Sequence, residues 1–293
     1  MFKKTRAEKP YYTISIIALI SKHMSKKSLT LWKYALAGTV SVLLPITALA
    51  LGTSSVELEF DTPTYLFIDD ESQTGLDLSA ELTIEMWFKL ESEPLGADAY
   101  QLISKRHSSG QRSYALELQP TGHPNGKGIG FYTWSNGVDS ACATFLDWEY
   151  QEGTWYHVAV TKSGTHVLFY VNGSQIGSVQ ICDNANIFEG AAEVRVGADD
   201  DANTKYDGLI DELRVWGVAR IPREISGRYR HELPKGDKVG LRAYWKFDGD
   251  YADSSGNGNN LSQIGANPFS EDVPSFACLK PSAENIKKCS LVL

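Results

Sequence analysis

Clusters of Lys and Arg are missing from the chain beyond residue 50. Residues 1–50 contain eight of the 28 basic residues and one of the 36 acidic ones, so the remaining chain carries 20 basic and 35 acidic side chains, a formal net charge of about −15. Nucleic-acid binding needs clustered basic side chains that displace counterions from phosphates. We therefore exclude nucleic acid as a partner, whereas the acidic surface is compatible with bound cations.

Cysteine is scarce, and its spacing is not that of a metal site. The four cysteines, Cys142, Cys182, Cys278 and Cys289, include no C-x-x-C pair and have no histidine close by, which argues against zinc. In an oxidising compartment an even number of cysteines forms disulfides, and four cysteines allow three pairings. Spacing favours Cys278 with Cys289, which would close a small C-terminal loop and leave Cys142 with Cys182.

The chain also lacks a Pro-rich or Ser-rich linker, an internal repeat and a low-complexity tract. Residues 54–270 can therefore form one domain, since all-β domains often reach this size. Residues 271–293 would follow as a C-terminal tail with its small disulfide loop. No G-x-S-x-G motif occurs and the six histidines stand in unrelated contexts, so nothing indicates a serine nucleophile.

The longest apolar run lies near the N-terminus and is typical of an export signal. Three lysines between positions 26 and 33 precede an uncharged, mostly apolar run at 34–50, which ends in Ala48-Leu49-Ala50. Small residues of this kind are what a signal peptidase requires. We expect residues 1–50 to be a signal peptide with an upstream extension, and the true start is either Met1 or Met24.

Cleavage after Ala50 would leave a protein without a stable membrane span, secreted to the periplasm or the extracellular space. The alternative is an uncleaved N-terminal helix that anchors the protein. Residues 29–51 come close to the length of about 20 residues that crosses a bilayer.

Side chains beyond residue 53 alternate with a period of two. In residues 82–90, one face carries Leu82, Ile84, Met86, Phe88 and Leu90, and the other carries Thr83, Glu85, Trp87 and Lys89. Such alternation predicts a strand with one face in the core. Further strands are predicted at 101–104, 114–118, 129–134, 156–161, 165–171, 175–181, 193–196, 209–216 and 241–247.

Two local signals complete the predicted fold. Asn172-Gly173 predicts a type I′ hairpin turn, because both residues tolerate a positive φ. Pro222 at a first-turn position, with Ile225 and Tyr229 four residues apart, predicts one short helix at 221–229. The sequence therefore predicts an all-β fold of two face-to-face antiparallel sheets with one helix.

Several longer motifs carry a family resemblance. They are GTWYHVAVT at 153–161, VLFYVNG at 167–173, GLIDELRVW at 208–216, LRAYWKFD at 241–248 and DSSGNG at 253–258. In order and spacing, from about Val56 to Leu261, they resemble LamG-like and pentraxin-like domains of the concanavalin A-like lectin/glucanase superfamily. The resemblance implies a jelly-roll sandwich, and it does not identify the ligand, since such folds host lectins, matrix binders and glucanases.

An acidic turn follows Gly197. Its carboxylates and amide are ligands that calcium prefers, and Asp199, Asp200 and Asp201 resemble the stretch with which pentraxins hold calcium. Pentraxins add an Asp-Asn pair from an earlier hairpin tip, but here the tip at 105–111 has no carboxylate and includes two basic residues. Because half of that ligand set is missing, a solvated acidic turn is the first interpretation and a calcium site is the alternative. The ligands of a calcium site here would be Asp199, Asp200, Asp201, Asn203 and Asp207.

Exposed aromatic side chains are what a sugar binder would use to stack on pyranose rings. Trp155, Trp216 and Trp245 fall on core positions of the resembling family. Trp134 and Trp148 therefore remain as the candidate ligand-binding residues.

Catalytic residues of the resembling glucanases are not matched. Retaining glucanases hold two carboxylates about 5 Å apart on one strand face. Glu57, Glu59 and Asp61 alternate, but no third acid follows at the required step. We expect a binding protein and not an enzyme: a secreted module that recognises glycans or glycoconjugates through its loops, dependent on calcium if the acidic turn holds the ion. The alternatives are a protein–protein adhesion module and a glycoside hydrolase.

Overall fold

The structure is a computed structural model that describes residues 47–60, 64–93, 97–200, 206–234, 238–278 and 289–291. The chain divides into two compact units, Leu49–Phe276 with Ser290–Leu293, and Met1–Ala48 with Ala277–Cys289. Residues 1–46 of the predicted signal peptide lie outside the described residues, and its cleavage stays a prediction. Strands β1 (Thr47–Ala50), β17 (Ser275–Cys278) and β18 (Cys289–Leu291) pair in a three-stranded sheet.

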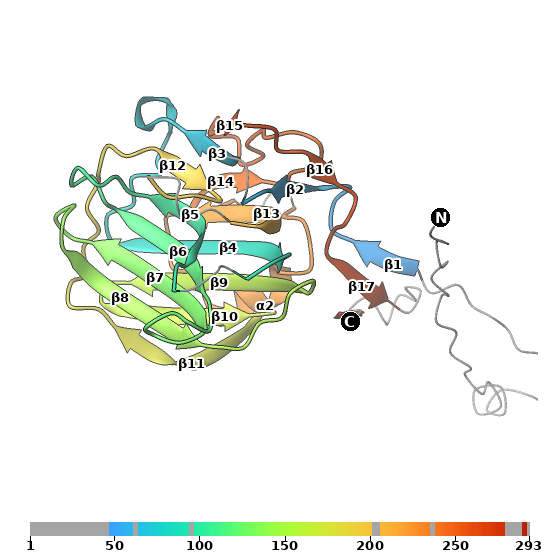
Figure 1. The fold of residues 1–293 in the computed structure, drawn as a ribbon, viewed down its shortest axis with the longest axis horizontal. Helices are drawn as coiled ribbons and strands as arrows, with labels where there is room; N and C mark the ends of the chain where they lie inside the picture. The colour runs from blue at the N-terminus through green and yellow to red at the C-terminus, as the bar shows by residue number, and fades with distance from the viewer. Residues whose placement is uncertain are drawn as a thin grey trace, which may run out of the picture. The chain divides into compact units, whose positions relative to one another are not determined.

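Two large antiparallel sheets form the larger unit (Figure 1). The eight-stranded sheet has the order β11-β10-β9-β4-β13-β2-β16, with β14 also paired to β13. Its strands are β2 (Ser55–Leu58), β4 (Glu81–Leu90), β9 (Trp155–Ser163), β10 (His166–Val171), β11 (Ser174–Ile181), β13 (Gly208–Trp216), β14 (Leu241–Trp245) and β16 (Phe269–Ser270).

The seven-stranded sheet has the order β15-β3-β12-β5-β6-β7-β8. Its strands are β3 (Tyr65–Ile68), β5 (Tyr100–Lys105), β6 (Tyr114–Gln119), β7 (Gly128–Trp134), β8 (Ser140–Asp147), β12 (Val194–Val196) and β15 (Ser262–Ile264). The predicted jelly-roll sandwich is confirmed. No helix in the described part of the chain has the length and apolarity needed to cross a membrane.

The core lies between the sheets and consists of alternate side chains. All five apolar residues predicted for the core face of β4 are buried in the main hydrophobic cluster, opposite residues such as Leu116 and Leu118 of β6. Asn172 has a φ of 49° and Gly173 a φ of 76°, which confirms the predicted hairpin turn between β10 and β11. β8 is absent from the predicted strands because its core-facing positions include Cys142 and Thr144, whose residue types give a weak apolar alternation.

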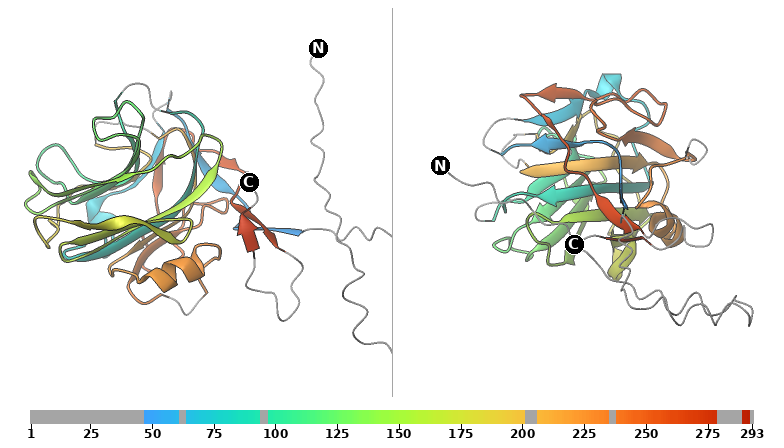
Figure 2. Two further views of the ribbon diagram at one scale, coloured as in Figure 1. Left: turned by 90° about the horizontal axis from the view of Figure 1, so that it is seen from below. Right: turned by 90° about the vertical axis from the view of Figure 1, so that its right-hand side faces the viewer.

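The predicted helix is α2 (Pro222–Arg228), which lies outside the eight-stranded sheet (Figure 2, left). It begins at Pro222, and the Glu224 side chain accepts the backbone N–H of Ile221 at 3.0 Å. Residues 217–234 cover the outer face of β4. Trp87 there is fully buried, and its indole N–H donates to the carbonyl oxygen of Tyr229 at 2.8 Å.

Charged groups are buried under this cover. The carboxylate of Glu85 accepts Arg220 Nη1 at 2.7 Å and the indole N–H of Trp216 at 3.0 Å, and Arg214 Nη1 lies 3.6 Å away. His157 Nε2 lies 3.8 Å from the other oxygen of Glu85. Burial lowers the pKa of His157 well below its usual value, and the charges of Arg214 and Arg220 lower it further.

The neutral His157 predicts a pH dependence. Because the pKa of His157 is lower in the folded than in the unfolded chain, His157 takes up a proton in the unfolded chain at a higher pH. Stability should therefore fall as the pH drops below about 6.5. His157→Phe should flatten the profile of unfolding free energy between about pH 6.5 and 5, measured by urea unfolding. His166→Phe, at an exposed position, is the matched control and should leave the profile unchanged; an unaltered slope in His157→Phe would contradict a neutral buried imidazole.

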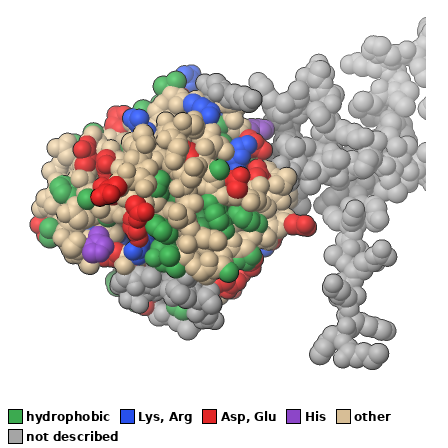
Figure 3. All heavy atoms as spheres, turned by 90° about the horizontal axis from the view of Figure 1, so that it is seen from above, with side chains coloured by type: hydrophobic (Ala, Val, Ile, Leu, Met, Phe, Trp, Pro, Cys, Tyr) green, Lys and Arg blue, Asp and Glu red, His purple; other side chains and the backbone are tan. Residues whose placement is uncertain are grey.

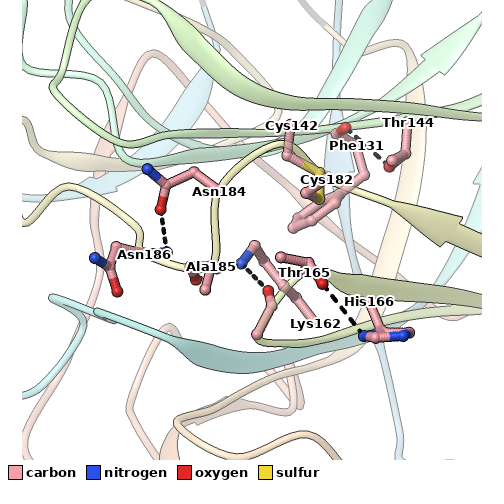
Figure 4. Close-up of a disulfide and its surroundings, with 11 residues drawn as sticks. Phe131, Cys142, Thr144, Lys162, Thr165, His166, Cys182, Asn184, Ala185 and Asn186 are labelled. Atoms are coloured by element: carbon pink, nitrogen blue, oxygen red, sulfur yellow. Dashed lines mark hydrogen bonds between the residues drawn. A yellow bond between two sulfur atoms is a disulfide. The ribbon is translucent and has the colours of Figure 1, made fainter.

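Cys142 and Cys182 form the predicted disulfide, with Cα atoms 4.6 Å apart (Figure 4). Cys142 lies on β8, an edge of the seven-stranded sheet, and Cys182 follows β11, an edge of the eight-stranded sheet. The bond therefore joins the two sheets at one side of the sandwich. The side chains of Cys278 and Cys289 lie outside the described residues, so their pairing stays a prediction.

Removing this disulfide should lower stability substantially. The cysteines are 40 residues apart in sequence, and closing a loop of this size reduces the entropy of the unfolded chain by an amount worth about 3–4 kcal/mol. The double variant Cys142→Ala, Cys182→Ala should show this loss in denaturant unfolding. A loss below about 1 kcal/mol would contradict the assigned stabilising role.

Candidate functional site

The outer face of the seven-stranded sheet lies on the side of the sandwich away from α2 (Figure 2, left). Side chains that point away from the core form two rows across neighbouring strands. The first row consists of Arg195, Ser104, Ala115, Tyr132 and Ala143, and the second of Gln101, Glu117, Gly130 and Phe145. This face therefore carries polar and aromatic groups, while the other face of the same strands supplies the core.

Glu117 is the centre of the second row. One carboxylate oxygen accepts the amide N–H of Gln101 at 2.7 Å, and the other accepts the amide of Gln119 at 3.1 Å and the hydroxyl of Tyr132 at 3.0 Å. Gly130 provides the room for these side chains, because a Cβ there would lie 2.8 Å from a Glu117 oxygen. None of the partners described for Glu117 is a second carboxylate, so this cluster is not an acid–base pair of the kind that glycosidases use.

Aromatic rings lie beside this polar cluster. The rings of Tyr132 and Trp134 stack with centroids 6.0 Å apart and planes 19° apart, and Phe145 meets Tyr132 edge-on at 5.7 Å. Trp134 thus lies on the candidate face, although it is only 5% exposed. Tyr132, which is half-buried, is more accessible than Trp134.

Trp148 lies elsewhere. It packs against the core, with its ring 4.8 Å from Tyr156 and 6.4 Å from Phe88, both in edge-on geometry. Its contacts are those of a half-buried packing residue.

A cavity of about 620 Å³ opens at the margin of the sheet, next to Arg195. Its size falls within the range of pockets that hold small ligands. Lys105, which is fully buried, donates to Asp70 at 2.5 Å and to the carbonyl oxygen of Ala192 at 2.6 Å, and so holds the short helix η2 (Asp70–Ser72) near residue 192. The cavity is lined by Asp69, Asp70, Glu71, Ser72, His107, Ser109, Gln111, Ala191, Ala192, Glu193 and Arg195.

The lining of this cavity is mostly polar, with carboxylate, imidazole, hydroxyl, amide and guanidinium groups. The face of the molecule seen in Figure 3 likewise carries many Asp and Glu side chains, in keeping with the acidic composition. Such groups can both donate to and accept from hydroxyl groups of a ligand.

The predicted calcium ligands fall into two places. Asp199 is 3% exposed, and its carboxylate pairs with Arg106 Nη2 at 2.5 Å. The carboxylate of Asp200 accepts the backbone N–H of Ser108. Both acids therefore contact the hairpin tip at 105–111. Asp201 and Asn203 lie outside the described residues.

Asp207 lies at the other end of the turn, where the chain enters the eight-stranded sheet. Its carboxylate accepts the hydroxyl of Ser92 and, at 3.4 Å, the backbone N–H of Phe60. Near it, the carboxylate oxygens of Glu57, Glu59 and Glu91 lie within 4.8 Å of one another. Calcium binding by the predicted set stays a prediction. Its described members contact different partners: Asp199 and Asp200 contact the hairpin tip, and Asp207 contacts Ser92 and Phe60.

Sequence reasoning overlooked Glu117, Gln101, Gln119 and Arg106 as site residues. The signal was present in part, since the strand predicted at 114–118 places Glu117 outward by alternation. Gln101 could not be assigned, because a register irregularity between Gln101 and Ile103 breaks the alternation along β5. Arg106 could not be assigned, because it lies beyond the end of that strand.

The fold and this face define a lectin-like jelly-roll domain. The family model of the concanavalin A-like lectin/glucanases superfamily matches residues 60–226, more than half of the chain. The protein belongs to this superfamily, and the resemblance drawn from the motifs is confirmed.

Individual relatives are distant. Adhesion G-protein coupled receptor V1 of Danio rerio is 26% identical over 157 residues, which cover 53% of this chain and 2% of the receptor. A protein from Bacteroides ovatus named as carbohydrate binding has a TM-score of 0.56 at 16% identity, covering 78% of this chain and 61% of that one. A heptameric pentraxin from Limulus polyphemus has a TM-score of 0.45 at 14% identity, with coverages of 78% and 96%. At 16% identity, the Bacteroides ovatus structure shows the fold alone.

Proposed function

We propose that the protein is an exported, non-catalytic carbohydrate-binding module whose ligand lies on the outer face of the seven-stranded sheet. The observation that carries the proposal is the carboxylate of Glu117, held by Gln101, Gln119 and Tyr132 on a face that the cavity at Arg195 borders. The carbohydrate-binding name of the Bacteroides ovatus protein supports the same class of ligand.

The chemistry of this face suits a sugar. Sugar hydroxyls donate and accept hydrogen bonds, while their C–H faces pack on aromatic rings. Tyr132, which is half-buried, supplies a ring and a hydroxyl. Glu117 and Gln119, each 5% exposed or less, hold that hydroxyl in place. Three side-chain donors fix the carboxylate before any ligand arrives, which lowers the entropic cost of binding.

Export is supported by the disulfide. Cys142 and Cys182 form a bond that persists in oxidising compartments and is rare in the cytosol. The predicted signal peptide leads to the same compartment.

A glycan array identifies the ligand, and isothermal titration measures its affinity for variants. Tyr132→Ala should reduce the affinity at least about tenfold, equivalent to about 1.4 kcal/mol, because the ring and the hydroxyl that holds Glu117 are both lost. Tyr251→Ala is the matched control: Tyr251 is also half-buried, but its hydroxyl bonds Gln263 and the carbonyl oxygen of Asn267. This control should bind as the wild type does.

Equal losses of affinity in both variants would contradict a ligand at this face. An array without any bound glycan would refute the carbohydrate proposal and favour adhesion to a protein. That alternative is supported by the similarity to the fish adhesion receptor.

One observation favours a second function, glycoside hydrolysis. Glu57, Glu59 and Glu91 hold carboxylate oxygens within 4.8 Å, close to the spacing of about 5 Å in retaining glycosidases. Burial raises the pKa of Glu91, and the charges of Glu57, Asp207 and Glu59 raise it further, as expected for a general acid.

Incubation with labelled oligosaccharides decides between binding and hydrolysis. Under the binding proposal their length stays constant, as read by chromatography. Shortening that the wild type produces and Glu91→Gln does not would overturn the non-catalytic assignment.

A further inference from the structure

The hairpin tip at 105–111 and the acidic turn after Gly197 meet in a contact made by Arg106, Ser108, Asp199 and Asp200, here called the tip–turn contact. We propose that Arg106 supplies to this turn the positive charge that a calcium ion would otherwise supply, so that the turn is held without a metal. Insofar as it concerns ligand binding, the inference rests on the proposed function.

Asp199 is a buried carboxylate that needs a compensating charge. Its side chain is 5% exposed, and an isolated carboxylate in such a place is costly unless a positive charge or hydrogen bonds compensate it. Arg106 Nη2 lies 2.5 Å from its Oδ2, and the Arg106 side chain is itself 22% exposed. The protein's own guanidinium therefore provides the compensation.

The tip offers hydrogen-bond donors where calcium would need oxygen ligands. Calcium takes six to eight oxygen ligands at about 2.3–2.6 Å. Toward the turn, however, the tip presents N–H donors: the Arg106 guanidinium to Asp199 and the backbone N–H of Ser108 to Asp200. These donors occupy carboxylate oxygens that a cation would need. A calcium ion at Asp199 would have to displace a buried ion pair, which is unfavourable because it leaves a guanidinium unpaired.

The tip–turn contact lies beside the candidate ligand face. Arg106 lies directly after the end of β5, two residues beyond Ser104 of the first outer row. Arg106 is also within electrostatic reach of Tyr132: burial raises the pKa of that phenol, Glu117 raises it further, and Arg106 opposes the shift. Arg106 is thus a positioning residue that holds the turn and the tip at the margin of this face.

Calcium titration of the unliganded protein tests the inference directly. Isothermal titration should show no calcium binding to the wild type, and its melting temperature should be the same in excess EDTA and in millimolar calcium. The titration measures calcium binding to the whole turn, including Asp201 and Asn203. Saturable calcium binding that raises the melting temperature would overturn the inference.

Variants test the role of Arg106. Arg106→Gln should lower the melting temperature by roughly 5–10 °C, because Asp199 keeps its buried charge and loses the guanidinium that offsets it. The double variant Arg106→Gln, Asp199→Asn should recover most of that loss, since it also removes the buried negative charge. Arg112→Gln is the matched control from the end of the same tip, where the guanidinium bonds only the carbonyl oxygen of Val138 at 3.2 Å among the described contacts. A loss in Arg106→Gln no larger than in this control, or no recovery in the double variant, would contradict the inference.

Glycan binding, measured in EDTA and in calcium, separates this inference from the proposed function. A glycan bound equally well with EDTA and with calcium supports both. A glycan bound only with calcium overturns the inference and leaves carbohydrate binding in place. If no glycan binds, the proposed function fails, and the calcium titration and the Arg106 variants still decide the inference.

Discussion

The structure depends on one constraint: the inner face of each sheet must be kept from water, and alternation fixes which side chains lie there. In β4, moving the pairing by one residue would bring Glu85 and Lys89 into the space between the sheets. The cost of burying these charges without partners selects a single register. The register of the strands also positions the side chains of the outer faces, including those of the candidate site.

The outer faces of the two sheets differ in what covers them. On the eight-stranded sheet, residues 217–234 cover Glu85 and Trp87, and the burial of Glu85 is compensated by Arg220 and Trp216. Such a buried ionic group adds little net stability, because the attraction between the charges is offset by the cost of removing them from water. On the seven-stranded sheet no comparable helix covers the outer face among the described residues. The polar group around Glu117 is held by side chains of its own strands.

The sandwich could be predicted from sequence because its determinants are local. Alternation in residues 82–90, the Asn172-Gly173 turn and the Pro222 helix start each depend on a few neighbouring residues, and each is found in the structure. The Cys142–Cys182 pair followed from spacing and the number of cysteines.

The site was less predictable because it depends on register between strands far apart in sequence. Asp199 pairs with Arg106, which lies 93 positions away in the sequence. Local sequence therefore could not show whether its partner is a cation or this arginine. Likewise, Glu117 and Gln101 become neighbours only through the pairing of β5 with β6. Trp134 was predicted to be a surface residue, but it is only 5% exposed, through contacts that composition does not reveal.

The disulfide at the edge of the sandwich also has a mechanical consequence. Both chain ends lie outside the loop that Cys142 and Cys182 close, so a pull applied between the termini bypasses the 40-residue segment that contains β9, β10 and β11. At about 3.3–3.6 Å per extended residue, roughly 130–140 Å of chain cannot lengthen until the bond is reduced. A reducing environment would therefore change how far this molecule stretches under load, as well as how stably it folds.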